Sequence, residues 1–137
     1  GKTMSRQRAG SLPGAPPFDA VVFCLAPADR SRLYRRIDTR VDRMLDAGIL
    51  EEARTVWENR ERYRTAAQAI GYKEFFSYFE GTAGLNACAE KLKQASRNYA
   101  KRQLTWFRRM KDVVWLDPDE PQLVQRAEQM VREHFQQ

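Results

Sequence analysis

Two short apolar runs near opposite ends of the chain constrain its fold more than any other feature. FDAVVFCLAP occupies residues 18–27 and ends near a proline, and VVWL occupies residues 113–116. A short uninterrupted apolar run is typical of a strand that is buried on both faces. We therefore predict strands at about residues 19–25 and 113–116.

Helical patterns fill most of the remaining chain. Asp29 is placed to cap a helix that Gly48 ends, and apolar residues recur at helical spacing between them. Further helices are predicted in ILEEARTVWENR, in KEFFSYFEG, and at about residues 86–110 and 121–135. The predicted fold class is α/β, helix-rich with two short strands. Because two strands cannot bury both faces of a sheet, we expect partner strands upstream of Gly1.

Composition narrows the class of protein. At 137 residues, with 42% hydrophobic and 31% charged residues, the chain is long enough for one globular domain. We find no apolar run near the roughly 18 residues of a membrane span, so we expect a cytoplasmic protein without a membrane partner. Cys24 and Cys88 lack metal-type spacing, which predicts buried, reduced thiols. The net charge of +6 makes a polyanionic partner plausible if the excess is concentrated.

The positive charge is concentrated on the predicted helix at about 86–110. At 100° per residue, an arc of about 140° collects Gln94, Arg97, Asn98, Lys101, Arg102, Thr105, Arg108 and Arg109. Like charges four residues apart destabilise a helix slightly, and few acidic residues offset them here. The pattern favours a phosphate-binding surface over a merely basic one. The opposite side is predicted to dock on the core through Leu92, Ala95, Tyr99, Trp106, Phe107 and Met110.

QAIGYKEFF, residues 68–76, is a second candidate. Gly71 permits a positive φ or a close backbone approach, and Tyr72 offers a ring for stacking. Lys73 opposes the helix dipole in a first turn, which suits a charged partner. Taken alone, these residues are also compatible with an ordinary helix start.

RRIDTRVDRM, residues 35–44, is a third. Arg36, Arg40 and Arg43 share one side of a predicted helix, where Asp38 and Asp42 could hold them in an ion-pair ladder. An oriented arginine is also well suited to bind a diphosphate through two hydrogen bonds. The residues alone leave both interpretations open.

The chain resembles the C-terminal half of the tRNA dimethylallyltransferases, also called tRNA isopentenyltransferases. Three stretches carry the resemblance, in this order: LYRRIDTRVDRMLDAGILEEA, TAAQAIGYKEFFSYFEG and SRNYAKRQLTWFRRMKDVVWLD. The resemblance implies a P-loop-type α/β core with a helical insertion. On this basis residues 1–17 are the end of the helical insertion arm and a linker. Residues 18–137 are then the C-terminal part of the catalytic core with tRNA-facing helices.

The resemblance also implies an activity. Such enzymes transfer a dimethylallyl group from dimethylallyl diphosphate to N6 of the adenosine 3′ to the anticodon, with Mg²⁺ assistance. The target base is turned out of its stack to be reached. The implied partners are the anticodon stem-loop of tRNA and dimethylallyl diphosphate, and we expect a monomer.

The resemblance assigns site residues by position. Arg40 matches an arginine that binds the diphosphate. Two segments match tRNA-binding residues: Gln68, Ala69, Ile70, Gly71, Tyr72 and Lys73, and then Lys101, Arg102, Gln103, Leu104, Thr105, Trp106, Phe107 and Arg108. Despite their place in the second segment, we assign Trp106 and Phe107 to packing.

Some expected parts have no match in this chain. The opening GKTMS begins with GKT, the last three residues of a P-loop motif, but lacks the preceding glycine-rich turn, so we do not expect Lys2 to bind phosphate. No carboxylate matches the aspartate that acts as general base. We expect the base, the P-loop and the main Mg²⁺ ligands upstream, and residues 1–137 alone to be inactive. The alternative is a non-catalytic RNA-binding helical module. His134, in the last helix, is predicted to be an exposed surface residue.

Overall fold

A computed structural model describes residues 18–136, so the opening GKTMS lies outside the described part. The elements in chain order are β1 (Val22–Leu25), α2 (Arg30–Asp46), α3 (Ile49–Glu58), the 3-10 turns η1 (Ala66–Gln68) and η2 (Lys73–Phe75), α4 (Phe76–Phe79), α5 (Leu85–Phe107), β2 (Val113–Leu116) and α6 (Leu123–Phe135). The predicted class, helix-rich α/β with two short strands, is confirmed. No helix among the described residues is long and apolar enough to cross a membrane.

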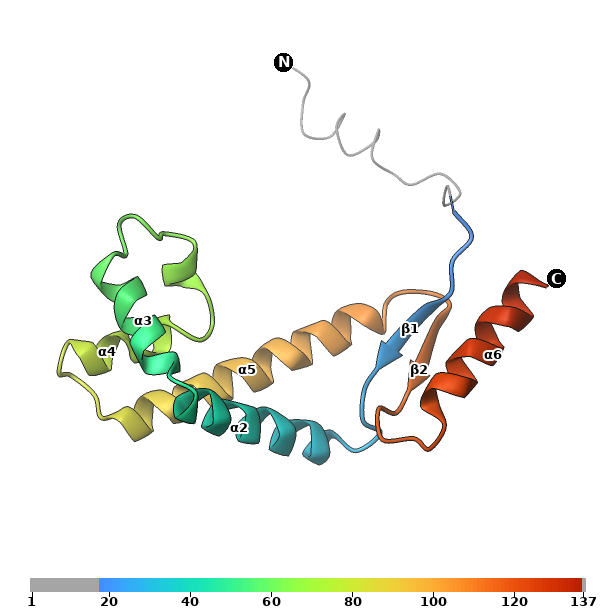
Figure 1. The fold of residues 1–137 in the computed structure, drawn as a ribbon, viewed down its shortest axis with the longest axis horizontal. Coiled ribbons are helices and arrows are strands. Elements are labelled where there is room, and N and C mark those ends of the chain that lie inside the picture. Colours follow the sequence, from blue (N-terminus) through green and yellow to red (C-terminus); the bar gives the residue numbers. More distant parts are fainter. Residues whose placement is uncertain (1–17, 137) are drawn as a thin grey trace, which may run out of the picture.

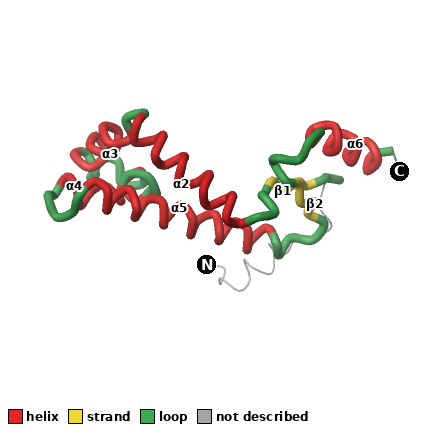
Figure 2. The backbone as a smooth tube through the Cα atoms, turned by 90° about the horizontal axis from the view of Figure 1, so that it is seen from below, coloured by secondary structure: helices red, strands yellow, loops and turns green. Residues whose placement is uncertain are grey.

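The described part is elongated. Helices α2 and α5 lie side by side along its middle, α3 and α4 pack at one end, and the two strands and α6 lie at the other (Figure 1). The same arrangement, turned by 90°, is seen in Figure 2. The protein therefore has a helical end and a sheet end joined by the α2–α5 pair.

The two strands pair in parallel, in a register that runs from Val22 opposite Val113 to Leu25 opposite Leu116. All helices from α2 to α5 thus form the connection that parallel strands require. The prediction that both strands are buried on both faces is wrong, because Leu25 is 59% exposed and Trp115 is 38% exposed. Burying both faces of a parallel sheet takes helices on each side. The described helices do not cover both faces of this two-stranded sheet.

Helix α2 begins and ends where the sequence predicts. The Asp29 carboxylate accepts hydrogen bonds from the Ser31 hydroxyl, at 2.6 Å, and from the Ser31 backbone N–H, at 2.8 Å. These two bonds lower the pKa of Asp29, the hydroxyl having the larger effect. Gly48 follows the helix with a φ of +96°, a conformation that favours glycine.

The core lies at the helical end. Its buried side chains come from α2, α3, η2 and the first half of α5: Val41, Ile49, Ala53, Phe75, Cys88 and Leu92. Both Cys24 and Cys88 are buried free thiols, as predicted, and burial raises the pKa of Cys24.

Beyond Leu92, helix α5 loses this cover. Tyr99 is 49% exposed, Trp106 is 60% exposed and Met110 is 37% exposed. The prediction that the apolar side of this helix docks on the core along its whole length is therefore wrong for its second half. The reason is that α3, α4 and η2 pack near the N-terminal end of α5 (Figure 1).

Two ion pairs join α2 to α5. Arg97 Nη1 lies 2.5 Å from Asp38 Oδ1, and Lys93 Nζ lies 2.8 Å from Asp42 Oδ1. The bond to Asp42, and a second one to Glu90 at 3.2 Å, raise the pKa of Lys93. The predicted ion-pair ladder within α2 is therefore wrong, because its aspartates face α5 instead. Arg97 is neutralised by Asp38, so it does not contribute to the free positive charge that the sequence predicted on this helix.

Asp117 joins the end of β2 to the start of α2. Its carboxylate accepts hydrogen bonds from the backbone N–H of Asp119, at 3.0 Å, and of Ala28, at 3.1 Å. These bonds lower the pKa of Asp117 below its usual value of 3.8. The carboxylate therefore stabilises the fold above pH 3.8, and this contribution is lost as the pH falls through the lowered folded-state pKa.

We predict that Asp117→Asn lowers the free energy of unfolding at pH 7 and flattens its fall at acid pH. Urea unfolding of both proteins, followed by circular dichroism between about pH 5 and pH 2, measures the two slopes. The exposed Asp46→Asn is the control and is expected to follow the unsubstituted protein. Equal acid slopes for Asp117→Asn and the unsubstituted protein would contradict this role.

Candidate functional site

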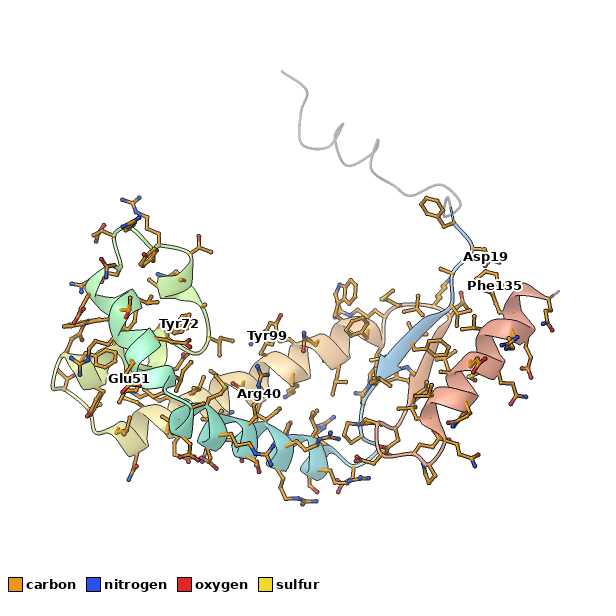
Figure 3. The ribbon with its side chains drawn as sticks, in the orientation of Figure 1. Asp19, Arg40, Glu51, Tyr72, Tyr99 and Phe135 are labelled. Atoms are coloured by element: carbon orange, nitrogen blue, oxygen red, sulfur yellow. The ribbon has the colours of Figure 1, made fainter. Side chains whose placement is uncertain are left out.

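A groove of about 700 Å³ runs between α2 and α5. It brings together three residues that the sequence analysis took from separate stretches: Arg40 of α2, Gly71 of the turn before η2, and Gln103 of α5. The complete lining is Leu33, Ile37, Arg40, Val41, Met44, Ile70, Gly71, Leu92, Ser96, Tyr99, Ala100 and Gln103. Figure 3 shows Arg40 and Tyr99 near the middle of the α2–α5 pair, with Tyr72 at the end where α3 packs.

The lining combines an apolar floor with a single charge. Leu33, Ile37 and Met44 of α2 and Leu92 of α5 form this floor, and Arg40 is the charged side chain among the lining residues described. Arg40 is exposed, and within residues 18–136 it forms no ion pair. Such a groove suits a ligand that has a small apolar part and an anionic group.

The residues of the turn at 68–73 do not all lie on one surface. Gly71 has a φ of +118°, which is one of the two roles predicted for it, and its N–H donates to Glu74 Oε2 at 2.9 Å. Ile70 and Gly71 line the groove, while Gln68 lines a separate hollow beside Arg60. The other three residues of the turn do not line the groove: Ala69 and Tyr72 are partly buried and Lys73 is exposed.

The side chains of the tRNA-binding segment predicted at residues 101–108 likewise lie on different sides of α5. A hollow of about 480 Å³ on its outer side is lined by Asn98, Lys101, Arg102, Thr105, Trp106 and Arg109. In the described part of the chain, Lys101, Arg102, Arg108 and Arg109 form no ion pair, and the first two and Arg109 line this hollow. Thr105 donates to the Lys101 carbonyl at 2.9 Å, and Leu104 and Arg108 line a third hollow near the strand ends.

Trp106 is an exposed ring in this surface. The prediction that Trp106 serves packing is wrong, since 60% of the residue is exposed, whereas Phe107 is partly buried. The two rings meet edge to face, with centroids 5.0 Å apart. Trp106 therefore presents a free aromatic face beside Lys101 and Arg102.

Tyr99 connects the groove to the cationic side of α5. The sequence analysis placed it in the core, but its side chain lines the groove, and the Arg102 guanidinium carbon lies 5.6 Å from its ring centroid. Ser96 and Ala100 were also missed. The signal that identifies them is helical spacing, because residues 96, 99, 100 and 103 share one side of a helix.

A magnesium ion does not fit the residues of this groove. No three His, Cys, Asp or Glu side chains come together among residues 18–136 as metal ligands would, and the charge in the groove is that of an arginine. Oxygen ligands from carboxylates are what Mg²⁺ requires.

The groove, the turn and the cationic side of α5 all lie in the region that matches a known family. The sequence model described as IPP transferase matches residues 1–110. This chain belongs to the IPP transferase family. The matched region includes Arg40, residues 68–73 and residues 101–108.

Individual relatives agree with the family. The chain is 52% identical over 118 residues to the tRNA dimethylallyltransferase of Lactobacillus gasseri, covering 86% of this chain and 37% of that protein. It is 50% identical over 116 residues to the tRNA dimethylallyltransferase of Geobacillus kaustophilus, covering 84% and 36%. This chain thus spans somewhat more than a third of the length of these relatives.

Solved structures of the family share the fold. The tRNA isopentenylpyrophosphate transferase of Bacillus halodurans matches with a TM-score of 0.79 and 36% identity, over 88% of this chain and 40% of that one. The tRNA isopentenylpyrophosphate transferase of Staphylococcus epidermidis matches with a TM-score of 0.76 and 35% identity, over 88% and 39%.

Proposed function

We propose that the protein to which this chain belongs modifies tRNA by transferring a dimethylallyl group from dimethylallyl diphosphate to N6 of the adenosine 3′ to the anticodon. This chain would supply walls that bind the diphosphate and the anticodon stem-loop. The observation that carries the proposal is the groove in which Arg40, Gly71 and Gln103 meet, from three segments far apart in sequence. Residues 18–137 would then be the C-terminal part of the catalytic core, with residues 1–17 as the end of an insertion arm.

The donor fits the chemistry of the groove. The guanidinium of Arg40 can bind a diphosphate through two parallel hydrogen bonds. Leu33, Ile37 and Met44 provide an apolar surface for the dimethylallyl group beside it. Arg40 would also stabilise the charge that develops on the leaving diphosphate.

The acceptor base fits the α5 side. The Gln103 amide can pair with the edge of adenine, and the ring of Tyr99 offers a face for stacking. A base turned out of the anticodon loop could enter here while its phosphates contact Lys101 and Arg102 on the outer side of α5.

In the proposed reaction, the N6 electron pair forms a bond to C1 of the dimethylallyl group. The bond from C1 to oxygen breaks, its electron pair leaves with the diphosphate, and the N6 proton passes to a general base. The resemblance assigns that base, and the ligands of Mg²⁺, to a segment outside this chain. Asp38 and Asp42 are engaged with Arg97 and Lys93, which argues against either being the base.

We predict that Arg40→Ala, in a full-length protein that carries these residues, lowers kcat/KM for transfer about 100-fold with little change in tRNA affinity. Lys101→Ala and Arg102→Ala should instead weaken tRNA binding and reduce its salt slope by about 0.7 to 0.9 per charge. Steady-state transfer of a labelled prenyl group and filter binding of tRNA measure the two effects. If all three variants lost tRNA affinity equally and kept full turnover at saturating tRNA, the chain would be an RNA-binding module and not part of an active site.

Trp106 is expected to stack on an unpaired base. Trp106→Ala should raise the Kd for tRNA about 5- to 150-fold, which corresponds to the roughly 1–3 kcal/mol of one stacked base, and Trp106→Phe should retain most of the affinity. Phe135, which is 55% exposed on α6, supplies the control Phe135→Ala. An unchanged Kd for Trp106→Ala would exclude stacking at this ring.

Residues 1–137 on their own are expected to bind tRNA but to transfer no dimethylallyl group. The reason is that no carboxylate of this chain matches the family's general base. An end-point assay with excess purified fragment and labelled donor tests this expectation. Transfer by the fragment would mean that the base lies within these residues.

A further inference from the structure

Helix α2 carries a second cationic surface, on the side that faces away from the core. A hollow of about 510 Å³ there is lined by Arg32, Arg35, Arg36, Thr39, Arg40, Arg43 and Asp119. We call the five arginines of this set the arginine face. At 100° per residue the face is centred roughly opposite Val41, which is buried in the core.

The arginine face is only partly neutralised. Asp119 pairs with Arg32 and, at 3.3 Å, with Arg36. Arg35 donates to the Ser31 hydroxyl at 3.0 Å, and among residues 18–136 no carboxylate lies within 4.0 Å of Arg35, Arg40 or Arg43. Like charges one turn apart destabilise a helix. A bound anion would offset the repulsion between these arginines.

The arginine face is continuous with the groove. Arg40 lines both the groove and the hollow of the arginine face. From Arg40 the face continues around α2, while Tyr99 and Arg102 bound the groove on the α5 side. Cations therefore border the groove on both helices.

We propose that the arginine face of α2 binds the phosphate backbone of RNA seated over the groove, apart from Arg40, which the proposed function assigns to the diphosphate. Arg32 to Arg43 span about 16 Å along the helix at 1.5 Å per residue, a length that suits successive phosphates of one strand better than a single diphosphate. Guanidinium groups bind phosphate oxygens in pairs of hydrogen bonds. The inference rests on the proposed function in one respect, namely that the RNA is the substrate tRNA.

The test uses a full-length protein that carries these residues. Arg35→Gln with Arg43→Gln removes two unpaired charges and leaves Arg40 and the pairs of Asp119 intact. Lys91→Gln with Arg62→Gln removes the same charge from exposed positions on α5 and on the loop after α3, neither of which forms a salt bridge within residues 18–136, and is the matched control. Lys101→Ala with Arg102→Ala, measured in parallel, tests the cationic side of α5.

Three quantities are measured for each variant: the Kd for unmodified tRNA, its dependence on salt from about 50 to 300 mM, and the KM for dimethylallyl diphosphate. For the Arg35 and Arg43 variant we expect a tRNA affinity about 3- to 10-fold weaker than that of the control. Its salt slope should be smaller by about 1.4 to 1.8, with an unchanged KM for the donor.

Each other result overturns the inference in a distinguishable way. If this variant behaves like the matched control while the α5 variant loses affinity, the arginine face does not bind RNA but the proposed function stands. If neither variant loses affinity, tRNA binding by this chain is itself contradicted. If only the KM for the donor rises, the face serves the diphosphate and not RNA.

Discussion

The contact between α2 and α5 is the interaction on which the rest of the structure depends. Arg97 and Lys93 reach across it to Asp38 and Asp42, and Val41 and Leu92 are buried beside these pairs. Together they fix how α2 is placed along α5. If α2 slid along α5 by one helical turn, about 5.4 Å, Arg40 would move away from Tyr99 and Gln103 and the lining of the groove would be lost. The ion pairs therefore act on the site through position, without touching a ligand themselves.

The same helix serves both the core and the site because its two halves have different surroundings. In the first half, Cys88 and Leu92 are fully enclosed by the packing of α3 and η2. In the second half, α2 lies along one side of the helix, but α3, α4 and η2 do not pack on it, so Tyr99 and Trp106 stay exposed beside the cationic side chains. The packed first half of α5 thus holds the exposed binding residues of its second half at fixed spacing.

Local signals could be predicted from the sequence, and long-range pairing could not. The caps of α2 and the positive φ of Gly71 follow from the preferences of single residues, and β2 occupies the predicted residues 113–116. The partners of Asp38 and Asp42 could not be chosen, since arginines lie at helical spacing on α2 and basic residues are equally available on α5. The exposure of Trp106 was missed because periodicity identifies an apolar side but not whether anything packs against it. The groove itself depends on three distant segments, so only the fold could bring its lining together.

The bridge between Ala28 and Asp117 has a consequence for how the chain folds. These residues lie 89 positions apart, and the parallel pairing of β1 with β2 closes the same long loop. Closing such a loop costs chain entropy that helix formation and short turns do not. Packing α5 on α2 closes a shorter loop, since Arg97 lies 59 positions from Asp38, and that packing would bring the two strands within reach of each other. The region that holds the groove would then form as an early unit, with the sheet as its late closure.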